Sequence, residues 1–133
     1  MAIHEYSVKT QGNTKISEHF RVREFACKDG TDSVMIASEL VCTLEKIREH
    51  FNRPVIINSA YRTPTHNKAV GGSPSSRHLL GQAADIRVKD VPPSIVYAFC
   101  SSLLTTGGVG KYDTFTHVDV RQKKSRWDYT KKK

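Results

Sequence analysis

Apolar residues recur at three- and four-residue steps between Ile36 and Phe51, and this spacing constrains the fold more than any other feature of the sequence. The apolar positions are Ala37, Leu40, Val41, Leu44, Ile47 and Phe51. Charged residues, among them Glu45 and Arg48, occupy the positions between them. A period near 3.6 places the apolar side chains on one face of a helix. We therefore predict an amphipathic helix over residues 36–51.

Short apolar runs separated by turn residues predict the strands of a small sheet. The runs cover residues 55–60, 83–88, 109–112 and 116–120. A second helix is predicted over residues 94–104, because Pro92-Pro93 precedes it and proline suits a first helical turn. The expected fold class is α+β, with a small, mostly antiparallel sheet and helices packed on one side.

The length of 133 residues is that of one ordinary domain. We expect residues 1–16 to form an N-terminal arm or edge strand, residues 17–121 the functional domain, and residues 122–133 a basic tail. Residues 61–81 are rich in glycine and proline and predict a long loop. Long ordered loops in compact domains are usually functional, so we expect this loop to border the site.

The net charge of +8 draws the chain toward polyanions, but charge alone does not select the partner. Much of the excess lies in the C-terminal tail, which we interpret as solvated, with Trp127 and Tyr129 packing back on the domain. No nucleic-acid-binding motif appears, so specific nucleic-acid binding is not expected. No apolar run approaches the ~20 residues of a membrane span.

Cysteine usage argues against a disulfide framework. The three cysteines, Cys27, Cys42 and Cys100, are odd in number and far apart, and they form no Cys-x-x-Cys pair that would suggest a thiolate zinc site. Cys42 and Cys100 fall in apolar stretches and are predicted to be small core residues. The N-terminus lacks the apolar run of a secretory signal, so we expect synthesis in the cytoplasm.

Three residues can ligate zinc from positions that regular structure would hold. His78 ends the long loop, Asp85 lies seven residues later in a predicted strand, and His117 lies in another strand. The strand period of two places His117 on the same face as Asp119. Two imidazoles and one carboxylate, with a fourth position left for water, are the composition of a catalytic zinc site.

Several motifs together resemble the zinc D-alanyl-D-alanine carboxypeptidase family, especially its short, single-domain branch from bacteriophage and bacterial genomes. The motifs are Ser59-Ala60-Tyr61-Arg62-Thr63-Pro64, Val70-Gly71-Gly72, Ser76-Arg77-His78, Gly81-Gln82-Ala83-Ala84-Asp85 and Phe115-Thr116-His117-Val118-Asp119. The resemblance implies a hedgehog-like α+β fold, one Zn²⁺ ion, and hydrolysis of peptide bonds that contain D-amino acids in bacterial peptidoglycan.

Carried over by position, the resemblance implies that His78, Asp85 and His117 are the metal ligands. Arg62 matches an arginine that holds a substrate carboxylate or polarises the scissile carbonyl, and a guanidinium suits either task. Ser76 matches a serine two residues before the first ligand, where we expect a hydroxyl that orders the loop. We place Ser76 and Tyr61 with Arg62 among the substrate-binding residues.

The general base departs from the pattern of better-known relatives. A glutamate three residues before the last histidine, or a histidine two before it, serves there, but this chain has Thr114 and Phe115 at those positions. Asp113 could swing in from its turn. Asp119 could accept the proton of water or orient a ligand imidazole. Both aspartates stay open as catalytic candidates.

We expect a monomeric zinc peptidase, either a D,D-carboxypeptidase or an endopeptidase, that acts on peptidoglycan peptide through zinc-activated water. It would reach the wall when released by lysis or a holin, or when carried on a phage particle. The alternative is a non-catalytic module of the same fold that binds the cell wall or serves as a phage structural component.

Overall fold

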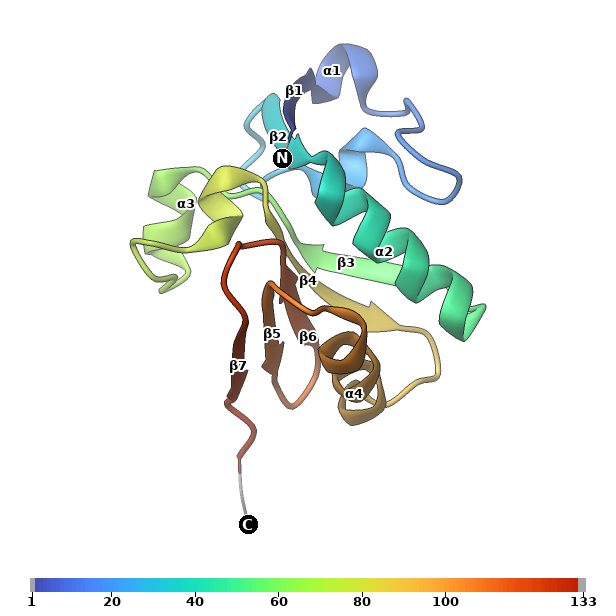
Figure 1. The fold of residues 1–133 in the computed structure, drawn as a ribbon. Helices are drawn as coiled ribbons and strands as arrows, with labels where there is room; N and C mark the ends of the chain where they lie inside the picture. Colours follow the sequence, from blue (N-terminus) through green and yellow to red (C-terminus); the bar gives the residue numbers. More distant parts are fainter. Residues whose placement is uncertain (1, 132–133) are drawn as a thin grey trace.

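The computed structural model describes residues 2–131, which form two sheets, four α-helices and two 3₁₀ turns (Figure 1). The strands are β1 (Ile3–Ser7), β2 (Ser33–Ala37), β3 (Val55–Ser59), β4 (Ala83–Val88), β5 (Gly108–Lys111), β6 (Thr116–Asp119) and β7 (Ser125–Asp128). The helices are α1 (Val8–Gln11), α2 (Ser38–Phe51), α3 (Pro64–Ala69) and α4 (Pro93–Leu103), and the 3₁₀ turns are η1 (Val22–Phe25) and η2 (Arg77–Leu80). The expected α+β class is confirmed.

The main sheet has five strands in the order β3-β4-β6-β5-β7. Its neighbours are antiparallel except for β5 and β7, which run parallel, so the mostly antiparallel sheet is also confirmed. A separate antiparallel ribbon joins β1 to β2. Among residues 2–131, every helix is too short or too polar to cross a lipid bilayer.

The two faces of the main sheet differ in chemistry. Ala84 and Ile86 of β4 and Val118 of β6 are fully buried in a core that α2 and α4 cover. Both helices lie to one side of the sheet, away from α3 (Figure 1). Because side chains alternate along a strand, Asp85 and His117 point to the opposite face, where they are paired directly across β4 and β6. Core packing and register therefore position the site.

The helix predicted over residues 36–51, which is α2, begins later than its apolar periodicity indicates. Ile36 and Ala37 belong to β2, where they pair with His4 and Ile3 of β1, and the helix starts at Ser38. Both residues are buried, so they fit an apolar helical face and a buried strand equally well. The expected N-terminal edge strand is present as β1, followed by the short helix α1.

The segment from Tyr61 to Gly81 contains two short helical elements that the loop interpretation missed. Thr63 caps α3 by accepting a hydrogen bond from the backbone N–H of His66, and Pro64 occupies the first helical turn. Ser76 caps η2 by accepting a hydrogen bond from the backbone N–H of His78 at 3.2 Å. These caps give the segment fixed geometry beside the sheet.

The interpretation of the C-terminal tail as solvated is wrong for residues 125–128, which add β7 to the main sheet. The Arg126 guanidinium donates hydrogen bonds to the carbonyls of Ser101, Leu104 and Gly107, where α4 ends and the chain turns into β5. These carbonyls have no helical partner, so the tail completes the fold. Lys132 and Lys133, like Met1, lie outside the described residues.

The prediction for the cysteines holds for Cys100, which is buried, and fails for Cys42, which is exposed on α2. Cys42 lies between apolar positions of the sequence, but it falls on the outer side of the helix. Burial raises the pKa of the Cys100 thiol to about 12, as expected for a residue held in an apolar core.

Candidate metal centre

Three metal-ligating side chains from separate elements converge on the open face of the main sheet. His78 comes from η2, Asp85 from β4 and His117 from β6, and all three are buried. One ligand atom of each lies within 4.8 Å of the others. The structure thus brings together the residues that the sequence singled out as metal ligands.

His78 is oriented by a backbone carbonyl. Its Nδ1 lies 2.6 Å from the carbonyl oxygen of Ala60, just beyond the end of β3. A carbonyl oxygen only accepts hydrogen bonds, so Nδ1 carries the proton and Nε2 presents a lone pair. That Nε2 lies 3.3 Å from Oδ2 of Asp85.

His117 is oriented by a carboxylate. Its Nε2 lies 2.8 Å from Oδ2 of Asp119, and its Nδ1 lies 3.0 Å from Oδ1 of Asp85. Arg121 donates to both oxygens of Asp119, at 2.8 Å from Nε to Oδ1 and 2.7 Å from a terminal nitrogen to Oδ2. Burial raises the pKa of Asp119, but hydrogen bonds from His117 and Arg121 outweigh it and hold the pKa well below its usual range. The ionised Asp119 can only accept a hydrogen bond, so the proton of a neutral His117 lies on Nε2. The Nδ1 atom of His117 then carries a lone pair.

The atoms that His78, Asp85 and His117 turn toward one another are therefore all electron-pair donors, and none of these atoms carries a proton. Burial works against the charged form of Asp85, yet His117 and His78 hold its pKa well below the usual range. For His117, burial lowers the pKa, while Asp119 and Asp85 raise it overall, so the cluster favours added positive charge. A divalent cation satisfies the same three groups, and two nitrogens with one oxygen suit zinc.

Close packing leaves room for Asp119 only because its neighbour on β5 is glycine. A Cβ atom at Gly108 would lie 2.3 Å from Oδ2 of Asp119. Instead, the backbone N–H of Gly108 donates to Oδ1 of Asp119 at 2.9 Å. The absence of a side chain thus lets the sheet hold this carboxylate behind His117.

Arg62 reaches the centre from the segment after β3. Its guanidinium donates to Ser59 Oγ at 3.2 Å, to Asn67 Oδ1 at 3.3 Å and to Asp85 Oδ2 at 3.3 Å. Asn67 is itself buried and donates to the carbonyl of Ser73 at 2.8 Å. Contacts on three sides hold Arg62 beside the carboxylate of a candidate ligand.

The three candidate ligands and Arg62 line a cavity of about 630 Å³ with one aromatic wall. The wall is formed by Tyr112, Phe115, Trp127 and Tyr129. Trp127 lies 5.1 Å from His117 between ring centroids and donates to the Tyr112 hydroxyl at 3.1 Å. A Cβ atom at Gly110 would lie 2.3 Å from the indole nitrogen, so glycine makes space for this ring. A concave site with a few convergent polar groups is typical of a small-ligand or peptide site.

The sequence model of one protein family, described as peptidase M15, matches residues 16–119. The chain belongs to the peptidase M15 family. This match covers most of the chain and includes all three candidate ligands. M15 is the zinc D-Ala-D-Ala carboxypeptidase family, so the resemblance seen in the sequence is confirmed, and membership implies a zinc metallopeptidase. A search of curated proteins finds no significant match to the chain.

Four cavity residues of this M15 chain lie beyond the matched range: Arg121, Ser125, Trp127 and Tyr129. No strand pattern is visible in the sequence of this segment, because charged residues surround Trp127 and only four residues pair. Trp127 does pack back on the domain as predicted, with a ring contact to His117, whereas Tyr129 touches the Tyr112 ring but stays 69% exposed.

The other predicted site residues of the M15 chain are placed less centrally. Ser76 lines the cavity and caps η2 beneath His78. Tyr61 is half-buried against the core and does not line the cavity. Asp113 lies on the exposed turn between β5 and β6, where it accepts a hydrogen bond from the backbone N–H of Lys131 at 3.3 Å. Its carboxylate does not line the cavity either.

A second cluster of candidate ligands comprises Cys27, Asp29 and His66, again with ligand atoms within 4.8 Å of one another. Asp29 is exposed, and its oxygens accept hydrogen bonds from the Thr31 backbone at 2.9 Å and the Thr63 hydroxyl at 2.8 Å. Contacts within the protein therefore account for this carboxylate. The buried triad is the better metal centre.

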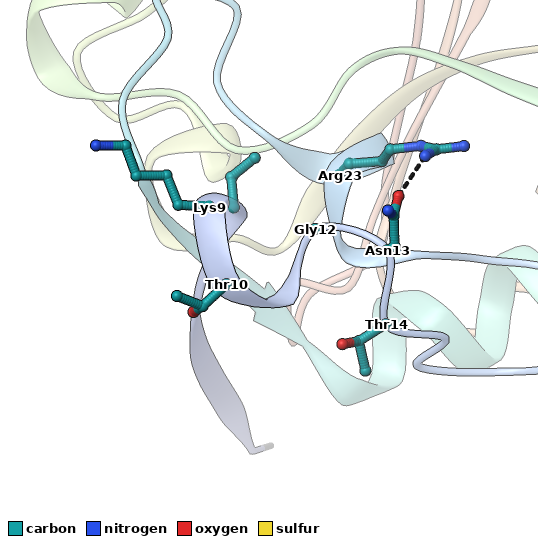
Figure 2. A pocket seen from close by; sticks show the side chains of 7 residues that line it. Lys9, Thr10, Gly12, Asn13, Thr14 and Arg23 are labelled. Carbon is teal, nitrogen blue, oxygen red and sulfur yellow. Dashed lines mark hydrogen bonds between the residues drawn. The ribbon is translucent and has the colours of Figure 1, made fainter.

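A separate pocket between α1 and η1 lacks the chemistry of a metal site (Figure 2). Arg23 donates a hydrogen bond to the side-chain oxygen of Asn13 there, and Lys9 and Thr10 also line the pocket. In the part of the chain that the structure describes, no histidine, cysteine or carboxylate lines this pocket. This pocket is therefore not a second candidate metal site.

Proposed function

We propose that the chain hydrolyses peptide bonds next to D-amino acids in bacterial peptidoglycan, with one zinc ion held by His78, Asp85 and His117. The observation that carries the proposal is the convergence of these three donors in a cavity that also holds Arg62. Membership of the M15 family supports zinc peptidase chemistry. The choice of peptidoglycan as substrate, and delivery to the wall by lysis or on a phage particle, are part of the proposal.

Each side chain has a distinct task in this proposal. His78, Asp85 and His117 hold the ion, which when bound would supply the Lewis acidity that lowers the pKa of water toward ~7 and polarises a carbonyl. Arg62 faces the same cavity with fixed donors, so it binds the substrate carbonyl or carboxylate oxygen and stabilises negative charge there. The aromatic wall holds the apolar parts of the peptide and excludes water.

The two candidate bases differ in how free their oxygens are. Both oxygens of Asp119 are engaged by His117, Arg121 and the Gly108 backbone, so we assign this residue to orienting His117. Asp113 is exposed at the turn, and its two oxygens share one hydrogen bond from the backbone N–H of Lys131. We assign proton transfer to Asp113, which reaches the cavity by movement of this turn.

Mass spectrometry of purified muropeptides tests the proposal. Zinc-loaded protein should release a terminal D-Ala or split a cross-bridge, and the mass change identifies the bond. His78→Ala should abolish the product, because it removes a ligand that no other donor replaces. Asp113→Asn should keep the metal but slow turnover about 10²- to 10⁴-fold.

One observation favours the alternative of a non-catalytic wall-binding or phage structural module. Thr114 and Phe115 stand where better-known relatives have a glutamate or histidine, and in the described residues no carboxylate other than Asp85 lines the cavity. That alternative predicts intact muropeptides that nevertheless bind the zinc-loaded chain. Absence of any cleavage product with wild-type protein would decide in its favour.

A further inference from the structure

A second hollow adjoins the metal-centre cavity and is strongly basic. It has a volume of about 800 Å³ and shares the lining residues Arg77, Arg121 and Ser125 with that cavity, so the two hollows adjoin at these side chains. Lys123 and Lys124, from the turn before β7, complete a set of four cationic side chains. Among residues 2–131, no carboxylate lines this hollow.

Most of this positive charge has no acidic partner among the residues that the structure describes. Among residues 2–131, the side chains of Arg77, Lys123 and Lys124 form no ion pair, whereas Arg121 is bound to Asp119. Like charges gathered in one hollow repel one another and raise the local positive potential. An anion placed among them relieves this repulsion and gains charge-assisted hydrogen bonds.

The position of the hollow relates it to the substrate. Arg77 directly precedes the candidate ligand His78 on η2, and Ser125 starts the strand that carries Trp127 past His117. A peptide whose scissile bond lies at the candidate metal centre can therefore reach the basic hollow by passing over the residues that the two hollows share. The basic side chains of the hollow then contact a group of the peptide that lies several bonds away from the reacting carbonyl.

We infer that the hollow lined by Arg77, Arg121, Lys123 and Lys124 is a subsite for a carboxylate carried by the peptide substrate. This inference rests on the proposed function for the nature of the peptide. It assigns the basic segment before β7 a role in substrate selection: acidic stem peptides bind, and peptides whose carboxylate is amidated bind less well.

Two peptides of equal length test the subsite directly. One is a muropeptide-derived stem peptide with a free carboxylate on its glutamyl residue, and the other has that carboxylate amidated. N-methylation of the peptide amides makes both resistant to cleavage, so calorimetric binding to the zinc-loaded chain is independent of turnover. We expect the free carboxylate to bind about tenfold more tightly, and the difference to shrink at high salt.

The double variant Lys123→Gln/Lys124→Gln should remove most of this preference, because the free carboxylate then loses two of its cationic partners. A matched control, Lys46→Gln/Lys89→Gln, removes two exposed charges from α2 and the turn after β4 and should keep the preference. Equal binding of the two peptides to the wild-type chain overturns the inference. So does binding of a phosphate-rich wall polymer that depends on Lys123 and Lys124 while both peptides bind equally.

The outcomes also separate this inference from the proposed function. A carboxylate preference without cleavage of natural muropeptides supports the subsite and contradicts the peptidase. Cleavage without any preference supports the peptidase and contradicts the subsite. Thermal melting of both double variants checks that the substitutions leave the fold intact.

Discussion

His117 Nε2 lies 2.8 Å from Asp119 Oδ2, two residues further along the same strand, and this contact decides which imidazole nitrogen faces Asp85. The strand period places both side chains on one face, and Arg121 holds the carboxylate from behind. A ligand imidazole whose outer nitrogen donates to a carboxylate is a recurring feature of metal sites. Asp119 thus orients His117, and through it would act on a metal bound at this site.

Replacing Asp119 by Asn should weaken zinc binding about 10- to 100-fold, because the charge that fixes the tautomer of His117 is lost. Competition with a chromogenic chelator measures the affinity. Asp113→Asn, on the exposed turn, is the matched control and should bind zinc as the wild type does. Equal affinities for all three proteins would contradict the orienting role of Asp119.

Trp127 is the single tryptophan of the chain, and its ring centroid lies 5.1 Å from that of His117. Binding of Co²⁺, which quenches nearby fluorophores, should therefore reduce the intrinsic fluorescence with a stoichiometry of about one ion. His78→Ala removes a ligand but leaves the indole in place, so its fluorescence should not respond. Quenching of equal depth in this variant would place the ion elsewhere.

Arg62→Lys should lower kcat about 10²- to 10³-fold, as loss of one oxyanion donor does, while zinc content is unchanged. The reason is geometric, because a single ammonium cannot keep the contacts to Ser59 and Asn67 and also face the cavity. Steady-state kinetics on muropeptides measures the effect. Arg87→Lys, an exposed arginine of β4, is the control and should retain activity.

Arg126→Ala should reduce the free energy of unfolding by about 2–3 kcal/mol, since three backbone carbonyls lose a charged donor. Urea denaturation monitored by circular dichroism measures the change. Arg53→Ala removes an exposed arginine, 3.6 Å from Asp90, and should change stability by less than about 0.5 kcal/mol. An Arg126 variant as stable as the wild type would show that β7 is not part of the cooperative fold.

The metal centre was predictable from the sequence because its residues lie in strongly patterned elements. Asp85 and His117 occupy strands whose apolar alternation was visible, and their register pairs them directly. His78 was recognised as a possible ligand at the end of the long loop, and the family motifs added Arg62. Their supporting contacts, such as the carbonyl of Ala60 on His78, depend on backbone positions that no side-chain pattern encodes.

The aromatic wall and the basic hollow could not be predicted because both depend on β7. A strand of four residues with charged neighbours has no apolar period, and its pairing with β5 is long-range in the fold. Gly108 and Gly110 appeared in the sequence only as turn or strand residues. Their role in admitting Asp119 and Trp127 becomes visible once the strands are paired.

The central claim is that His78, Asp85 and His117 hold one zinc ion in the wild-type chain. X-ray absorption spectroscopy at the zinc edge, combined with elemental analysis of the purified protein, tests it most directly. We predict one zinc per chain, coordinated by nitrogen and oxygen only, and loss of that zinc in His78→Ala. A sulfur ligand, which would point to Cys27, or zinc content unchanged by the substitution would contradict the account.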